Sequence, residues 1–174
     1  MRNKYLHLLL ISNALIIFDQ YTKLMITLHV PLHYSVRVID DFFSLTHIRN
    51  AGVAFGLFAN NASDYKALFF ITVSVIAIMA ILVIYYQTPN YKRMVLNGLI
   101  LILSGAIGNL IDRVLYKEVI DFLDFYYQDF HWPAFNVADS CITIGVGLMM
   151  VDLFRDQTNS ESSLSLGESS RNEP

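Results

Sequence analysis

The sequence predicts a mainly α-helical membrane protein, with a bundle of four transmembrane helices and a small β-rich patch outside the membrane. Of the 174 residues, 55% are hydrophobic and only 16% are charged, whereas soluble domains carry about 25% charged residues. The mean hydropathy is +0.46. Crossing a hydrocarbon core of about 30 Å takes about 20 mostly apolar residues, and four stretches are that long. They predict one membrane domain over residues 1–155, with helices near 5–25, 67–86, 94–113 and 135–154.

The first two apolar stretches differ in their polar content. The stretch 5–25 follows two basic residues and could be read as a secretory signal sequence, but it continues past its small residues without a cleavage site, which favours a membrane helix. Asp19 and Lys23 lie four positions apart within it and could form a local ion pair. The stretch 67–86 carries no charge and is expected to serve as scaffold.

The β-rich patch is predicted from two connecting segments. Residues 36–49, VRVIDDFFSLTHIR, and 119–127, VIDFLDFYY, are rich in β-branched and aromatic residues, which is typical of strands. Asn50 and Gly52 then predict a turn. A patch of two or three strands on the membrane surface would satisfy its backbone hydrogen bonds better than loose loops would.

Polar residues mark the last two apolar stretches. The third ends in SGAIGNLIDR, where Asn109 and Arg113 share a helical face. The fourth begins with Asn136 and Asp139. An Asp at the centre of a membrane helix costs about 2.5–3.5 kcal/mol, so such residues usually face a polar cavity. The pair could equally be a helix cap with an acid in the first turn, where the helix dipole favours negative charge.

The short loop QTPNYKR sets the predicted orientation. Its basic residues and those before the first helix fall on one side of the membrane, which predicts that both termini are cytoplasmic. The polar residues of three helices then meet at one level near the outer surface, which indicates a shared polar cavity. The Ser-rich segment 156–174 is expected to be a disordered cytoplasmic tail.

The composition also excludes some classes of site. The net charge is −3 and the basic residues are scattered, so no surface for nucleic acid is predicted. Cys141 is the only cysteine, which excludes an intrachain disulfide and favours a packing role for this residue. No cluster of His, Cys and carboxylate residues has the spacing of metal ligands, and we expect neither a metal nor another cofactor.

Short polar motifs occur in a fixed order along the chain. They are DQYTK at 19–23, NAGVAF at 50–55, GNLIDR at 108–113, VIDF at 119–122 and FNVAD at 135–139. Together they resemble the bacterial lipoprotein signal peptidases, also called signal peptidase II, which are aspartyl proteases of the inner membrane with four transmembrane helices. One departure is Ser104, where the family usually has a second glycine before Gly105.

The resemblance implies a substrate and a setting. The substrate is a prolipoprotein that already carries diacylglycerol on a cysteine, and the cut falls just before that cysteine. The site lies on the periplasmic side of the bacterial inner membrane. Membrane lipids are the other expected partners, and we expect the protein to act as a monomer.

The resemblance also implies the catalytic pair, Asp121 in VIDF and Asp139 in FNVAD. One carboxylate takes a proton from water while the other, protonated, polarises the scissile carbonyl. The amino terminus of the fourth helix favours a charged Asp139, which makes Asp121 the initial acid. Read alone, Asp121 could be an ordinary solvated charge beside Asp124. The implied supporting residues are Asp19, Lys23, Asn50, Gly52, Asn109, Arg113 and Asn136.

Other readings stay open at this stage. Arg113 could pair with Asp112, with Asp19 or with a lipid phosphate. A serine protease could use Ser104 or Ser140 with Lys23 as base. A proton-coupled transporter would also place acids inside a bundle, although it would normally show repeats in two halves. A noncatalytic membrane scaffold is the remaining alternative.

Overall fold

Four long helices carry most of the chain. The computed structural model describes the backbone of residues 3–52 and 63–169 and the side chains of 3–52 and 66–155. The helices are α1 Lys4–His29, α2 Ser63–Gln87, α3 Arg93–Tyr116 and α4 Val137–Ser169. Each contains a segment long and apolar enough to cross a membrane, namely Lys4–His29, Lys66–Gln87, Arg93–Tyr116 and Val137–Arg155. The prediction of four helices near these positions that are long and apolar enough to span a membrane is confirmed.

Helix α3 is the centre of the bundle, and it packs against the other three helices. Its contact with α4 depends on small residues. A Cβ at Gly98 would lie 2.8 Å from the carbonyl oxygen of Gly145, and a Cβ at Gly105 would meet the backbone of Ala138. Ser104, the departure from the family pattern, is buried, and its Oγ donates to the Ile100 carbonyl at 2.6 Å. This hydroxyl is therefore accommodated within its own helix.

The strands form an antiparallel sheet in the order β1-β2-β3-β4. Their bounds are β1 Ser35–Ile39, β2 Phe43–Asn50, β3 Val119–Tyr127 and β4 Phe130–His131. The strand predicted over 119–127 is confirmed. The segment 36–49 is instead a hairpin, because the chain turns at Asp41, whose φ is +57°. Asp and Asn tolerate this left-handed conformation better than bulkier residues do.

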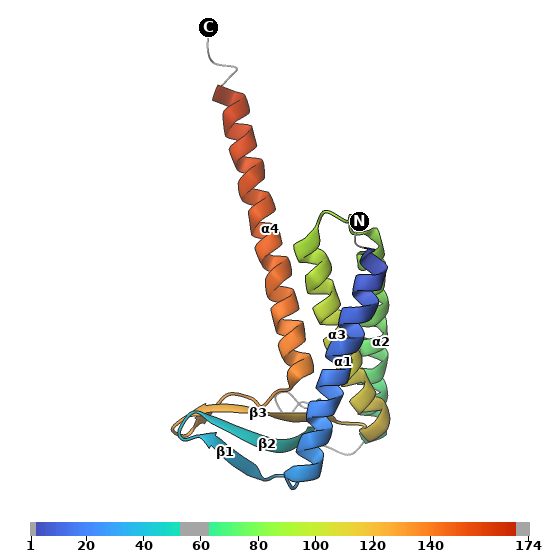
Figure 1. Cartoon of the computed structure of the whole chain (residues 1–174), viewed down its shortest axis with the longest axis vertical. Helices are drawn as coiled ribbons and strands as arrows, with labels where there is room; N and C mark the ends of the chain where they lie inside the picture. Colours follow the sequence, from blue (N-terminus) through green and yellow to red (C-terminus); the bar gives the residue numbers. More distant parts are fainter. Residues whose placement is uncertain (1–2, 53–62, 170–174) are drawn as a thin grey trace.

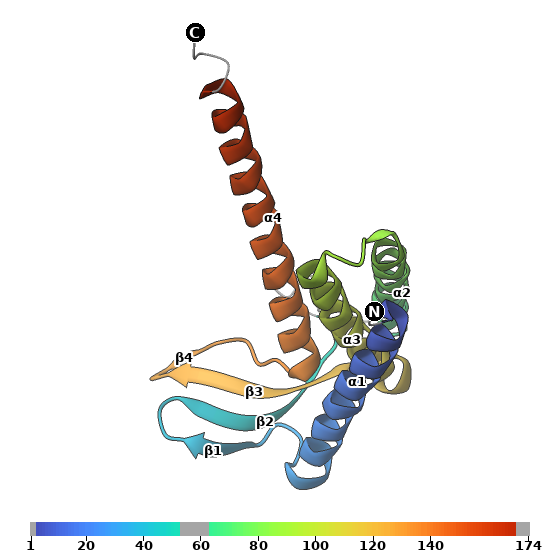
Figure 2. The same cartoon turned by 45° about the horizontal axis from the view of Figure 1, so that its top comes forward.

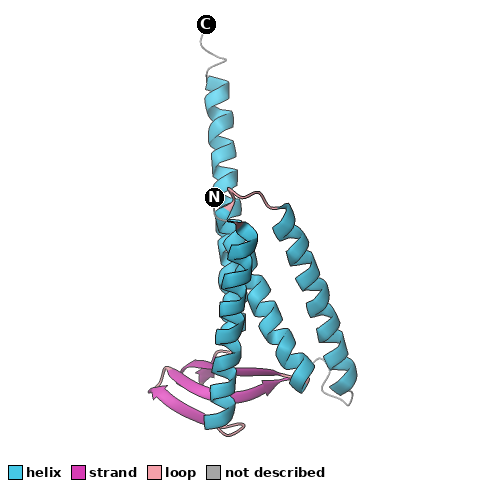
Figure 3. Ribbon diagram, turned by 45° about the vertical axis from the view of Figure 1, so that its right-hand side comes forward, coloured by secondary structure: helices cyan, strands magenta, loops and turns pink. Residues whose placement is uncertain are grey.

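The sheet lies at one end of the bundle, and the loop between α2 and α3 lies at the other (Figure 1). The first residues of α1 are also at this second end, while the end of α1 and the start of α4 meet the sheet (Figure 2). Asn109 of α3 contacts Lys23 of α1 and Asp139 of α4, so polar residues of three helices meet at one level, as the alternation of the spans predicts. The strands lie at one end of the helices (Figure 3).

Helix α4 is longer than expected. The sequence predicts its end near residue 154, whereas the helix runs to Ser169 and projects beyond the other helices (Figure 1). The added residues include no proline and a single glycine, so nothing in their backbone chemistry breaks a helix. The division into a membrane domain and a disordered tail over 156–174 stays a prediction.

Candidate active site

The start of α4 is closed by a reciprocal pair of hydrogen bonds. The Asp139 backbone N–H donates to Oδ1 of Asn136 at 2.9 Å, and the Asn136 backbone N–H donates to Oδ2 of Asp139 at 3.2 Å. This is a capping box, which satisfies N–H groups that a helix start leaves free. The interpretation of these two residues as a helix cap is confirmed, and it coexists with a second set of contacts.

The side-chain amide of Asn136 reaches the other acid. Its Nδ2 donates to Oδ1 of Asp121 at 2.8 Å, while Asn136 itself has no exposed surface. A single buried residue therefore binds the carboxylates of both Asp121 and Asp139. Residues that are 18 positions apart in the sequence are brought to one place where β3 meets the start of α4.

Asp121 is not a solvated surface charge, because it is 3% exposed. Strand pairing of β2 with β3 places Asn50 near it, and Nδ2 of Asn50 donates to Oδ2 of Asp121 at 3.0 Å. Burial raises the pKa of Asp121 to about 6; the negative charge of Asp139 adds to the rise, and the amides of Asn50 and Asn136 counter it. Asp139 is less buried than Asp121.

Asn109 holds the second acid in place. Its Nδ2 donates to Oδ1 of Asp139 at 2.8 Å. Its own Oδ1 accepts from Nζ of Lys23 at 3.1 Å and from Nδ2 of Asn136 at 3.2 Å. Because donors surround the oxygen, the amide is fixed with its nitrogen toward Asp139.

Lys23 is the centre of a buried charge cluster. Its Nζ lies 2.9 Å from Oδ2 of Asp19 and 2.8 Å from Oδ2 of Asp112, and all three side chains are at most 2% exposed. The predicted ion pair of Asp19 with Lys23 is confirmed. Gln20 Nε2 adds hydrogen bonds to Asp19 at 3.1 Å and to Asp112 at 2.9 Å. The cluster joins α1 to α3.

Both acids of this cluster also fix the backbone next to the candidate pair. Oδ1 of Asp19 accepts from the Ala138 N–H at 2.8 Å, directly before Asp139. Oδ2 of Asp112 accepts from the Ile120 N–H at 3.2 Å, directly before Asp121. The cluster therefore fixes the backbone directly before each of the two candidate acids.

Gly52 and Arg113 lie at the edge of the site. Gly52 has φ +82°, and its N–H donates to Oδ1 of Asn50 at 2.8 Å, which confirms the predicted turn. A Cβ at Gly52 would collide with the ring of Phe70 on α2. The Arg113 guanidinium is 5.6 Å from the centroid of the same ring. The rest of the NAGVAF motif, residues 53–55, lies outside the described residues.

The structure disfavours the serine–lysine alternative. Oγ of Ser104 donates to the Ile100 carbonyl and Oγ of Ser140 donates to the Asn136 carbonyl at 2.9 Å. Nζ of Lys23 contacts the carboxylates of Asp19 and Asp112 and neither of these serines. Neither hydroxyl is thus paired with a base.

The sequence interpretation misses three members of the site. It suggests Asp112 only as a partner for Arg113, although Asp112 pairs with Lys23 and holds β3. Gln20 lies inside the DQYTK motif, which by itself predicts no role for it. Phe70 belongs to the charge-free span, where no sequence signal separates it from the lipid-facing residues.

Comparisons with known proteins agree on one family. The family model described as Signal peptidase (SPase) II matches residues 11–155. A lipoprotein signal peptidase of Desulforapulum autotrophicum is 49% identical over 139 residues, covering 80% of this chain and 86% of that protein. One of Geobacter sulfurreducens is 47% identical over 142 residues, covering 82% of this chain and 88% of that protein.

The fold comparison points the same way. A solved bacterial membrane enzyme superposes with a TM-score of 0.77 at 35% identity, covering 88% of this chain and 90% of that chain. A second bacterial membrane enzyme gives a TM-score of 0.76 at 36% identity, with 86% and 94% covered.

Proposed function

Because this chain belongs to the signal peptidase II family of aspartic endopeptidases, which remove signal peptides from prolipoproteins, we propose that Asp121 and Asp139 together activate the water that cuts the peptide bond. The observation that carries this proposal is the double role of Asn136, which hydrogen-bonds both carboxylates. Two acids that share a site can divide the roles of acid and base.

The two acids differ in a way that suggests their starting roles. Asp121 is the more deeply buried, and burial raises its pKa to about 6. Asp139 lies in the first turn of α4, where the helix dipole stabilises negative charge. Of the two acids, Asp121 is thus the one whose protonated form the site favours, so we assign to it the proton given to the scissile carbonyl and to Asp139 the role of taking a proton from water.

The proposed step balances without a metal or another cofactor. The water oxygen bonds to the carbonyl carbon, and the resulting tetrahedral diol then collapses. The carbon–nitrogen bond breaks as the proton held by Asp139 passes to the leaving amine. One hydroxyl of the diol returns its proton to Asp121 and becomes the carbonyl oxygen of the new carboxyl group, so both acids regain their starting states. The pair titrates as a unit, so the pH dependence of the reaction belongs to both carboxylates.

Asn50, Asn109 and Asn136 are positioning residues in this scheme, because they donate to the carboxylates. Lys23 acts one step further away, through the amide oxygen of Asn109. Asp19 and Arg113 brace the surrounding helices, and Gly52 leaves room for the Phe70 ring at the edge of the site.

The proposed substrate is a prolipoprotein modified with diacylglycerol, cut just before the lipidated cysteine. The position of the acids supports it, since they lie where the membrane-crossing part of α4 begins and the sheet ends. A peptide bound there would keep its acyl chains beside the apolar helices while the scissile bond lies at the level of the acids.

We further propose an inner-membrane protein with both termini in the cytoplasm, acting as a monomer among membrane lipids. The basic residues of the α2–α3 loop support this orientation. It places the sheet and the two acids on the periplasmic side.

The test is cleavage of a diacylglyceryl-modified precursor by purified protein, followed by mass spectrometry of the products. We expect Asp121→Asn and Asp139→Asn to fold and yet to release no product, while the wild type releases a protein that begins with the lipidated cysteine. Asp129→Asn is the matched control, because Asp129 is an exposed acid in the turn that follows β3. Wild-type rates in either active-site variant, or cleavage at another bond, would overturn the proposal.

A further inference from the structure

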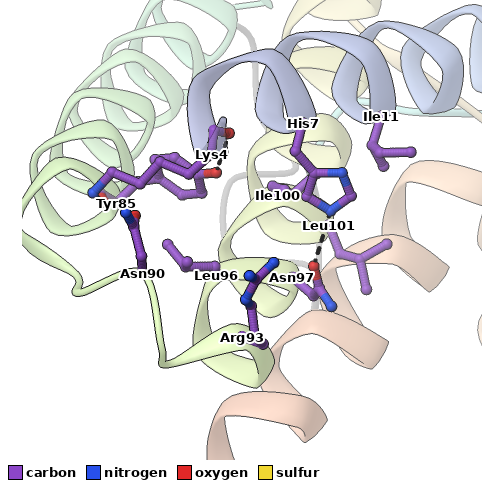
Figure 4. A pocket seen from close by; sticks show the side chains of 10 residues that line it. All are labelled: Lys4, His7, Ile11, Tyr85, Asn90, Arg93, Leu96, Asn97, Ile100 and Leu101. Atoms are coloured by element: carbon purple, nitrogen blue, oxygen red, sulfur yellow. Dashed lines mark hydrogen bonds between the residues drawn. The ribbon is translucent and has the colours of Figure 1, made fainter. Parts of the chain in front are cut away.

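A cavity of about 480 Å³ lies at the end of the bundle opposite the acids. It is formed where the first turns of α1 meet the end of α2 and the start of α3 (Figure 4). Its lining residues are Lys4, His7, Ile11, Tyr85, Asn90, Arg93, Leu96, Asn97, Ile100 and Leu101. The proposed peptidase mechanism uses none of them.

The polar side of this cavity is cationic. Lys4 and Arg93 line it, and no acidic side chain does. Lys4 already has acceptors, since its Nζ donates to the carbonyls of Tyr86 at 3.0 Å and Thr88 at 2.9 Å. Lys4 therefore contributes positive charge and fastens α1 to the end of α2.

Arg93 is the charged residue of this cavity that can bind a ligand. It is exposed, and within the described ranges 3–52 and 66–155 its guanidinium has no acceptor. Figure 4 shows its side chain reaching from the start of α3 toward Asn97 and His7. Nε2 of His7 and Oδ1 of Asn97 are 3.2 Å apart, so this hydrogen bond joins the two helices beside the guanidinium.

The other side of the cavity is apolar. Leu96 and Ile100 are buried at 4% and 1% exposure and form its inner wall. Ile11 and Leu101 continue this wall along α1 and α3 toward the middle of the membrane. An occupant that combines an anionic group with a hydrocarbon chain would complement both sides of the cavity.

We propose that this cavity binds an anionic phospholipid of the leaflet opposite the acids, which is the cytoplasmic leaflet in the proposed orientation. The Arg93 guanidinium donates hydrogen bonds to the headgroup phosphate, a geometry for which Arg is well suited. One acyl chain lies along Ile11 and Leu101. The bound lipid joins the starts of α1 and α3 and thereby stabilises the bundle.

The test compares lipids that share acyl chains and differ in charge. Purified full-length protein in neutral detergent is titrated with dimyristoyl phosphatidylglycerol, dimyristoyl phosphatidylcholine or soluble glycerol phosphate. Native mass spectrometry measures the bound molecules, and thermal unfolding measures stabilisation. We expect phosphatidylglycerol to bind and to raise Tm, and glycerol phosphate to do neither. Phosphatidylcholine should bind more weakly and raise Tm less, because its choline cation is repelled by Lys4 and Arg93.

Arg93→Gln should weaken phosphatidylglycerol binding about tenfold, the loss expected for one charge-assisted hydrogen bond. Arg37→Gln is the matched control, because Arg37 is an exposed arginine on β1 at the other end of the molecule. It should bind phosphatidylglycerol as the wild type does, and both variants should keep peptidase activity. Equal binding by Arg93→Gln and wild type, or equal stabilisation by phosphatidylcholine or glycerol phosphate, would overturn the proposal.

Discussion

Replacing Lys23 by Met should destabilise the protein strongly, because it removes the positive charge that Asp19 and Asp112 share and leaves both carboxylates buried. Nζ of Lys23 lies 2.9 Å and 2.8 Å from the carboxylates of Asp19 and Asp112, with at most 2% of any of these side chains exposed. Breaking a buried ion pair by removing one partner costs about 3–5 kcal/mol. For a chain of this size, that loss lowers Tm by roughly 10 °C.

The assay is thermal unfolding of the purified protein in one detergent, monitored by intrinsic fluorescence. Lys92→Met is the matched control, because the Lys92–Asp152 pair is longer, at 3.7 Å, and its side chains are 32% and 19% exposed. A longer, partly exposed pair of this kind contributes about 1 kcal/mol at most, so Tm should change by no more than about 4 °C. If Lys23→Met and Lys92→Met lower Tm equally, the cluster does not stabilise the bundle as argued.

Three further predictions concern the site and the helix packing. Because burial raises the pKa of Asp121 from 3.8 to about 6, the folded state binds a proton on this group more tightly than the unfolded state does. The free energy of unfolding should therefore be highest below pH 3.8 and fall by about 3 kcal/mol as pH rises through about 6. Asp121→Asn should remove this decline from a pH series of unfolding free energies, and an unchanged slope would contradict the burial argument. Gly105→Ala should cost about 1–3 kcal/mol by overpacking against Ala138, whereas Gly147→Ala, which meets open space, should cost nothing; equal Tm values would refute this. EDTA should leave cleavage of the lipidated precursor unchanged, and loss of activity that added metal restores would rule out a pair of acids as sole activator of water.

The sequence predicts the elements whose physical signal is local. Each membrane helix is a long apolar run, so length alone locates it, and strict alternation of the spans predicts that Asp19, Asn109 and Asp139 approach one level. Contacts within the described residues confirm that convergence. The motif resemblance adds Asp121, which a sequence reading without it would leave on a surface strand.

Other features depend on geometry that no local pattern contains. Asp112 precedes Arg113, which makes a contact between neighbours the simplest reading, yet the helix directs Asp112 toward Lys23. Phe70 is one aromatic residue among many in α2, and only the packing places it against Gly52 and Arg113. The sequence does not separate β1 from β2, because the turn residues between them, Asp40 to Phe42, include no glycine or proline.

The most direct test of the central claim is the single-turnover cleavage rate of a lipidated precursor by Asp121→Asn, Asp139→Asn and the double variant. If the two carboxylates act as a unit around one water, each single replacement should lose as much rate as the double replacement does. A single variant that retains the wild-type rate, or losses that multiply as for independent groups, would contradict the proposed shared role.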